Sequence, residues 1–288
     1  MAGRKEKQAM LTMLLCSCLW SIGGIFIKVL DMNSMVIAGF RSLIAAMTVV
    51  VYMFVLKQRL VINRNVLLST VSLAATFICF CTANKLTTSA NAIVLQFSAP
   101  VFIMIISGIF LKTRFRPIDI AAVTLTVSGI AMVVLDGLGT GRTIGNIVGI
   151  MSGFTMGCMF VFVGETPKDE KMSGILLGHL LTAIIGIPFA FFTQNTFNAK
   201  SIGVLFILGV VQLGIPYRLL GIASNNCPAF ACALISATEP LLNPVWVWIF
   251  DGEHPTALAF VGSAVVIVSV TLWCVLKDSP ILSRRKSV

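Results

Sequence analysis

The chain has 288 residues, of which 57% are hydrophobic and 11% are charged, and its formal net charge is +10. Because a soluble domain carries about 25% charged residues, this composition excludes a soluble globular protein and a disordered chain. The net positive charge therefore does not indicate nucleic-acid binding. The sequence predicts an integral membrane protein.

Ten apolar stretches follow one another along the chain, with short polar connections between them. They are 8–30, 35–56, 66–86, 91–111, 117–135, 144–163, 172–192, 201–225, 228–250 and 256–276. Each is long enough to cross the hydrocarbon core as a helix, and a helix satisfies its backbone polar groups internally. We therefore expect an all-α integral membrane protein with ten transmembrane helices.

The lysines and arginines divide unequally between the two sides of the predicted membrane. With the N-terminus placed inside, fifteen fall on the inner side: Arg4, Lys5, Lys7, Lys57, Arg59, Arg64, Lys112, Arg114, Arg116, Lys168, Lys171, Lys277, Arg284, Arg285 and Lys286. Three fall on the outer side, and these are Lys85, Arg142 and Lys200. Because positive charge is retained inside, we expect a protein of the cytoplasmic membrane with both termini in the cytoplasm.

The sequence repeats itself weakly with a lag of about 140 residues. Segment 88–112 aligns with 228–252, so that Pro100 falls on Pro240. Each half holds five predicted spans, an odd number, and the second half must therefore enter the membrane inverted. Inverted repeats are typical of secondary transporters, whose substrate site lies near the midplane between the repeats. We expect two domains, a first five-helix repeat over 1–137 and an inverted second repeat over 138–288.

Several short motifs occur in a characteristic order. They are Leu19-Trp20-Ser21 with Lys28, Arg41 with Ala45-Ala46, Ser89-Ala-Asn-Ala92 through Pro100, Glu239-Pro240-Leu241, and Gly252-Glu253. Together they resemble the EamA family of the drug/metabolite transporter superfamily over essentially the whole chain. The resemblance implies ten helices in two inverted repeats and alternating-access transport of small metabolites, often outward. Arg218, within the eighth span, departs from the family pattern and could mark a substrate particular to this chain.

Four ionisable residues lie within the predicted spans, where charge is costly and usually functional. Arg218 fits either a clamp for a carboxylate or phosphate or an ion pair with Glu239. Arg41 fits either substrate contact or a structural role near the outer entrance. Glu239 could instead exchange a proton during transport, and His179 fits a hydrogen-bonded packing residue or a titrating group.

Polar and aromatic residues at similar depths complete a predicted cavity. We expect substrate-binding roles for Trp20, Arg41, Asn84, Gln96, His179, Gln212, Tyr217, Arg218 and Glu239, with Asn226 nearby. The sequence contains neither a phosphate-binding Gly-x-x-x-x-Gly-Lys-Ser/Thr motif nor a His-Glu-x-x-His zinc motif. No catalytic residue, metal ligand or cofactor site is therefore predicted.

The leading hypothesis is a secondary transporter, not an enzyme, for a small amino-acid-like or anionic metabolite, in the direction of export. Its partners would be the small-molecule substrate and the lipid bilayer, while protons as coupling ion and a homodimer stay open. Two alternatives also stay open: a membrane-embedded enzyme acting on a lipid-linked substrate, and a passive channel. The enzyme would need clustered acids, bases or metal ligands. Glu239 alone does not form such a cluster.

Overall fold

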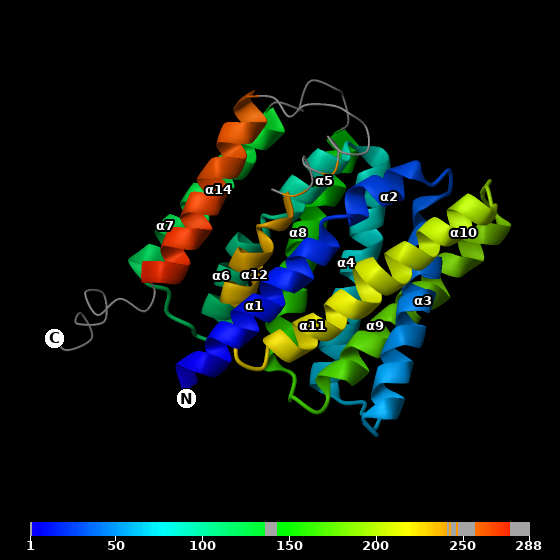
Figure 1. The fold of residues 1–288 in the computed structure, drawn as a ribbon, viewed down its shortest axis with the longest axis horizontal. Helices are drawn as coiled ribbons and strands as arrows, with labels where there is room; N and C mark the ends of the chain where they lie inside the picture. The colour runs from blue at the N-terminus through cyan, green and yellow to red at the C-terminus, as the bar shows by residue number, and fades with distance from the viewer. Residues whose placement is uncertain (1, 136–142, 241, 243–245, 247–256, 277–288) are drawn as a thin grey trace.

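The computed structural model describes residues 2–135, 143–240, 242, 246 and 257–276, and the regular structure in these ranges is helical (Figure 1). The α-helices are α1 (Ala2–Trp20), α2 (Gly23–Val29), α3 (Ser34–Val55), α4 (Arg64–Leu86), α5 (Ser89–Gln96), α6 (Ala99–Phe110), α7 (Pro117–Leu135), α8 (Thr143–Glu165), α9 (Lys171–Gly186), α10 (Ala199–Phe206), α11 (Ile215–Ala223), α12 (Ala229–Ser236) and α14 (Ala257–Leu276). A 3₁₀-helix, η2 (Ile187–Phe191), continues α9, and a π-helix, η3 (Ile207–Gly214), joins α10 to α11.

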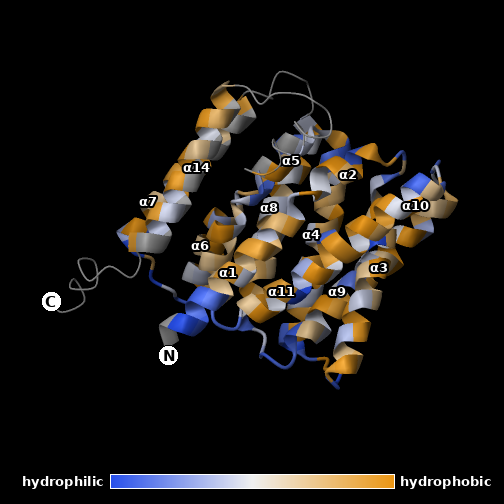
Figure 2. Ribbon diagram, in the orientation of Figure 1, coloured by the Kyte–Doolittle hydropathy of each residue, from blue (hydrophilic) through white to orange (hydrophobic). Residues whose placement is uncertain are grey.

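Many of these helices carry apolar residues on their outer surfaces (Figure 2). Phe54, Phe110 and Phe191 are 83%, 77% and 84% exposed, as is expected only where lipid covers them. Among the described residues, six segments are long and apolar enough to cross a membrane: Arg4–Val29, Ser34–Val55, Arg64–Leu86, Thr143–Glu165, Lys171–Phe191 and Ala199–Ala223. They coincide with six of the predicted spans and identify a multi-pass membrane protein. The count of ten stays a prediction, because part of the predicted span 228–250 lies outside the described residues.

Asparagine side chains start three of the helices directly after short connections. The Asn33 side chain accepts a hydrogen bond from the Met35 N–H at 2.9 Å, and Asn63 accepts one from the Val66 N–H at 3.0 Å. Asn198 and Ser201 cap α10 reciprocally. Because the first N–H groups of a helix lack partners within it, such caps fix where a helix begins. The short polar connections therefore set the starts of α3, α4 and α10.

The predicted fourth and ninth spans are each interrupted by a turn. The turn at 97–98 separates α5 from α6, and the turn at 237–238 follows α12. Pro100 and Pro240 come two residues after these turns, and proline has no N–H to donate to the carbonyl four residues earlier. The Ser17 hydroxyl donates to the freed carbonyl of Ser236 at 3.1 Å. A two-residue turn thus interrupts the helix just before Glu239 and Pro240.

The π-helix η3 brings the eighth span against α3. A Cβ atom on Gly209 would lie 2.5 Å from Cβ of Ile44 and 2.9 Å from the carbonyl oxygen of Arg41. Only glycine allows this approach, because any larger residue would push the two helices apart. No sequence pattern predicts this π-helix, a form whose wider turn is common at functional sites. The close packing places Arg41 beside Gln212.

Connections at the two ends of the bundle hold the helices together. At one end, the Lys28 ammonium donates to the Thr87 carbonyl at 2.7 Å, and the Asn33 N–H donates to the Asn195 side chain at 2.9 Å. At the opposite end, the start of α1 lies near the α8–α9 connection and the end of α11 (Figure 1). The helices α7 and α14 form a pair at one edge, where the Trp273 indole donates to Asp119 at 2.8 Å.

Candidate functional site

Helices from both halves of the chain enclose a small cavity of about 20 Å³ near the middle of the bundle. We call it the central cavity. It is lined by Trp20, Arg41, Thr76, Phe77, Phe80, Gln96, Met156, Gln212, Leu213, Tyr217 and Glu239. Six of the nine predicted site residues are among them, so the structure brings together most of the predicted set.

Arg41 presents a buried positive charge to the central cavity. Its side chain is 1% exposed, and its two terminal nitrogens donate to the Gln212 side-chain oxygen at 3.2 Å and to the Phe77 carbonyl at 3.3 Å. Among the described residues, the Nε atom has no hydrogen-bond partner and no carboxylate forms an ion pair with the guanidinium. Since an uncompensated buried charge is costly, this side chain is suited to receive an anionic group.

Glu239 presents a carboxyl group to the same cavity. It directly follows the break in the ninth span and is 3% exposed. Within the described part of the chain, its carboxylate forms neither a hydrogen bond nor an ion pair, and the single ion pair there joins Arg116 to Asp119. Arg41 and Glu239 thus line one cavity without forming an ion pair, which leaves the guanidinium and the carboxyl group available to a ligand.

An aromatic cluster forms one wall of the central cavity. The Tyr217 ring lies 5.1 Å from Trp20 and 4.8 Å from Phe77, measured between ring centroids. His179 is fully buried and stacks on the far side of this cluster, with its ring 4.7 Å from Phe77. The histidine does not line the cavity, and neither ring nitrogen has a hydrogen-bond partner in the part of the chain that the structure describes. It therefore supports the Phe77 ring and is not a hydrogen-bonded packing residue.

The predicted polar residues separate into two groups. Gln96 lines the cavity and donates to the Ser152 hydroxyl at 2.7 Å. Asn84 is buried outside the cavity lining and donates to the Phe80 carbonyl at 3.0 Å, so its contacts lie within α4. Asn226 lies at the end of the bundle that carries the N-terminus, away from Arg41 and Glu239.

The structure places Arg218 outside the central cavity. Its side chain is exposed, and its guanidinium lies 4.2 Å from the centre of the Tyr52 ring. Successive residues of an α-helix point about 100° apart, and because Tyr217 faces the cavity, Arg218 faces outward. The expected ion pair between Arg218 and Glu239 is not formed, and the cavity's arginine is Arg41. The exposed guanidinium packs on an aromatic face, as long cationic side chains do at the rim of a membrane protein.

Sequence reasoning missed five residues that line the cavity: Thr76, Phe77, Phe80, Met156 and Leu213. One of them had a usable signal, since Phe77 lies 140 residues before Tyr217, at the lag of the sequence repeat. The others look like ordinary span residues. In the described ranges, no group of three or more His, Cys, Asp or Glu side chains is placed to hold a metal ion.

Comparison with known proteins identifies relatives of this architecture. A family model described as the EamA-like transporter family matches residues 7–135 and 143–274. YdfC, an uncharacterized transporter of Bacillus subtilis (strain 168), is 24% identical over 245 residues, which are 81% of this chain and 79% of that protein. One solved crystal structure superposes with a TM-score of 0.78 at 14% identity, covering 98% of this chain and 99% of that one, and therefore shares the fold.

Proposed function

The chain belongs to the EamA-like transporter family, and on this premise we propose that it is a secondary transporter for a small amino-acid-like or anionic metabolite. The proposed direction is export across the cytoplasmic membrane, with both termini in the cytoplasm. Transport proceeds by alternating access between a first repeat at 1–137 and an inverted repeat at 138–288. The two stretches that match the family model lie on either side of the proposed boundary and support this division.

The observation that carries the proposal is that Arg41 and Glu239 line one cavity and do not neutralise each other. Guanidinium groups bind carboxylates and phosphates through charge-assisted hydrogen bonds. We therefore propose that Arg41 binds the anionic group of the substrate. Glu239 would bind a positive charge, which is either the ammonium group of an amino-acid-like substrate or a coupling proton.

The remaining lining residues position these two charges and shape the cavity. Gln212 accepts a hydrogen bond from Arg41 and holds its guanidinium in place. The Trp20 indole N–H is buried and has no partner among the described residues, so we assign it as a donor for a bound ligand. Trp20 and Tyr217 provide an apolar wall, while Gln96 contributes a polar edge. The proposed binding set is therefore Trp20, Arg41, Gln96, Gln212, Tyr217 and Glu239.

A cavity of about 20 Å³ holds roughly one water molecule. The transporter must therefore open to admit a metabolite, and the helix breaks at 97–98 and 237–238 adjoin cavity residues Gln96 and Glu239. Discontinuous helices commonly flank the substrate site of secondary transporters, and breaks of this kind absorb changes in backbone direction. We assign these two turns as hinges of the access cycle.

The test is reconstitution of the purified chain into liposomes, after a thermal-shift screen of amino acids and small organic anions. A ligand that binds the native state raises the melting temperature. The proposal expects a hit from the screen to move across the liposome membrane, and expects Arg41→Gln to reduce both the shift and the flux strongly at the same ligand concentration. A matched charge removal at exposed Arg218 should leave both intact. Normal binding and flux with Arg41→Gln would refute the proposed site.

A further inference from the structure

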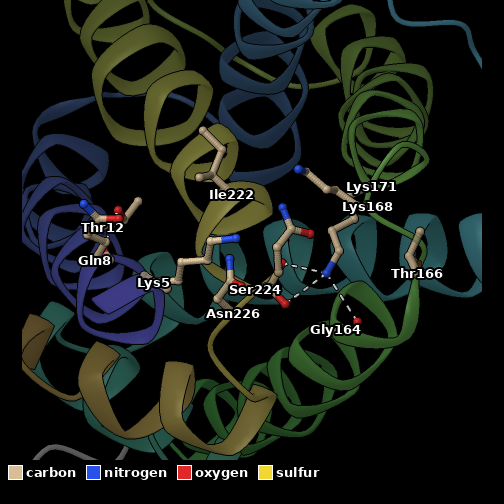
Figure 3. A pocket seen from close by; sticks show the side chains of 12 residues that line it. Lys5, Gln8, Thr12, Gly164, Thr166, Lys168, Lys171, Ile222, Ser224 and Asn226 are labelled. Carbon is tan, nitrogen blue, oxygen red and sulfur yellow. Dashed lines mark hydrogen bonds between the residues drawn. The ribbon is translucent and has the colours of Figure 1, made fainter. Parts of the chain in front are cut away.

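A second and larger hollow, of about 580 Å³, lies at the end of the bundle that carries the N-terminus (Figure 3). We call it the lysine pocket. It is lined by Lys5, Gln8, Ala9, Thr12, Gly164, Thr166, Lys168, Lys171, Ile222, Ser224, Asn225 and Asn226. Its volume falls in the range of small-molecule sites, whereas the central cavity is far smaller.

The lining of the lysine pocket is positively charged and polar. Three lysines come from three segments: Lys5 from α1, Lys168 from the α8–α9 connection, and Lys171 from the start of α9. No lining residue is acidic. The side chains of Thr12, Thr166, Ser224, Gln8, Asn225 and Asn226 add hydroxyl and amide groups. Like charges that surround one hollow repel each other unless an anion occupies it.

Lys171 shows that this charge is built into the fold. Its side chain is 3% exposed, and its ammonium donates to the Gly164 carbonyl at 3.3 Å, the Ser224 carbonyl at 3.2 Å and the Ser224 hydroxyl at 2.9 Å (Figure 3). These acceptors lie at the ends of α8 and α11, and all are uncharged. The hydrogen bonds hold the ammonium in place but do not neutralise it.

Lys5 and Lys168 differ from Lys171 because both are exposed at the rim of the pocket. Among the described residues, neither forms an ion pair. They are therefore available to an incoming ligand, while Lys171 supplies a fixed positive charge below them. Basic pockets between transmembrane helices are a known way to hold phosphate-bearing groups.

The lysine pocket lies on the same helices as the central cavity. Thr12 of α1 lines the pocket and Trp20 lines the cavity, eight residues away, which is about 12 Å along a helix. On α8, Gly164 lines the pocket and Met156, eight residues away, lines the cavity. Met13, Phe160 and Leu220 lie between the two hollows along their helices and are each at most 2% exposed. An apolar layer therefore separates two distinct sites.

We propose that the lysine pocket is an anion-binding site, separate from the central cavity, for a phosphate or carboxylate group. The group belongs either to a small soluble anion or to the headgroup of an anionic lipid, because both offer the same charge and hydrogen-bond acceptors. The assignment does not depend on transport by the central cavity. It rests on the three lysines, the absence of acid from the lining, and the size of the pocket.

The first arm of the test uses the full chain in detergent and inorganic phosphate as the probe, with chloride used to keep the ionic strength constant. Phosphate should raise the melting temperature, and the shift should keep increasing with the phosphate concentration. The double variant Lys5→Gln, Lys168→Gln should lose this shift, and both residues are exposed, so folding is retained. The matched control Lys7→Gln, Lys57→Gln removes the same charge from exposed positions outside the pocket and should keep the shift.

The second arm compares nanodiscs of phosphatidylcholine with nanodiscs that also contain phosphatidylglycerol. If the lipid headgroup is the ligand, phosphatidylglycerol should raise the melting temperature of the wild type but not of the Lys5→Gln, Lys168→Gln variant. A soluble anion as ligand should instead give the shift with phosphate alone. The proposal is overturned if neither probe stabilises the wild type, or if the double variant responds as the wild type does. Both arms measure ligand binding through the melting temperature. They can therefore be interpreted even if the chain transports nothing.

Discussion

The rings of Phe77 and Tyr217 meet edge to face with their centroids 4.8 Å apart, although the two residues are separated by 140 positions in the chain. Trp20 and Phe160 have the same separation, and their rings are 6.3 Å apart. In a pair of repeats related by a two-fold axis, a residue contacts its own counterpart only close to that axis. Both contacts are expected if the proposed inverted repeat has its axis beside the central cavity, since secondary transporters bind substrate between their repeats.

We predict that Arg41→Gln weakens binding of the transported substrate roughly ten- to a hundredfold, which corresponds to losing a charged hydrogen bond of about 1.5–3 kcal/mol. Arg41→Lys should recover only part of the affinity, because one ammonium cannot reproduce the planar fork that reaches Gln212, the Phe77 carbonyl and a ligand. The measurement is the dissociation constant of the substrate for each purified variant.

Arg218→Gln is the matched control for the loss of charge. Its side chain is exposed on the Tyr52 ring, so we expect substrate affinity within about twofold of the wild type, as for surface substitutions that change stability by at most about 0.5 kcal/mol. Equal losses in the Arg41 and Arg218 variants would show that the cavity arginine has no special part in binding.

For Glu239→Gln we predict that the protein still folds and inserts, because a neutral amide is less costly to bury than a carboxylate that lacks a partner. If Glu239 carries the coupling proton, the variant should exchange substrate for substrate across liposomes and lose only its response to a pH gradient. If Glu239 binds a substrate ammonium, exchange itself should fail. Exposed Glu165→Gln is the control, and uphill transport by Glu239→Gln with an unchanged pH profile would exclude both roles.

A packing prediction concerns two glycines of the same span. Gly209→Ala should destabilise the protein by about 1–3 kcal/mol, the usual range for overpacking a close contact, because its Cβ would press on Ile44 and the Arg41 backbone. Gly203→Ala should be tolerated, since no atom lies within 4 Å of a Cβ at that position. Thermal unfolding of both variants tests the difference, and equal melting temperatures would contradict the close approach of η3 to α3.

The orientation in the membrane can be tested with single cysteines in a cysteine-free background. Lys200→Cys should react with a membrane-impermeant maleimide in intact cells, and Lys168→Cys should react only after permeabilisation, because the distribution of lysines and arginines places Lys168 inside. Both side chains are exposed and accessible to the reagent. The reverse pattern of labelling would contradict cytoplasmic termini.

Composition and the length of the apolar runs were enough to predict a helical membrane protein, because a helix satisfies the backbone polar groups of such a run within the membrane. The motif around Trp20 and the charges of Arg41 and Glu239 also led to the cavity, since polar residues at mid-span rarely face lipid. The expected position of Arg218 was wrong because depth along a helix does not determine which face a residue occupies. Tyr217 and Arg218 share a depth, yet only Tyr217 faces inward.

Features that depend on contacts between helices were beyond reach of the sequence. The π-helix at Ile207–Gly214 is an example, since its packing against α3 requires both spans to be placed. The lysine pocket is another, because Lys5, Lys168 and Lys171 come together only through the arrangement of α1, α8 and α9. From the sequence, each of these lysines is predicted only to lie on the inner side of the membrane, and their proximity to one another is not.

Flux in proteoliposomes tests whether the chain is a secondary transporter whose substrate is bound by Arg41. The wild-type chain would be reconstituted with a metabolite identified by thermal shift, and its movement would be followed under an imposed gradient of substrate or protons. We predict that the labelled metabolite accumulates above its equilibrium level, and that this accumulation is strongly reduced in Arg41→Gln and kept in Arg218→Gln. Flux that only runs downhill and ignores the gradient, or that is the same in the Arg41→Gln protein as in the wild type, would contradict it.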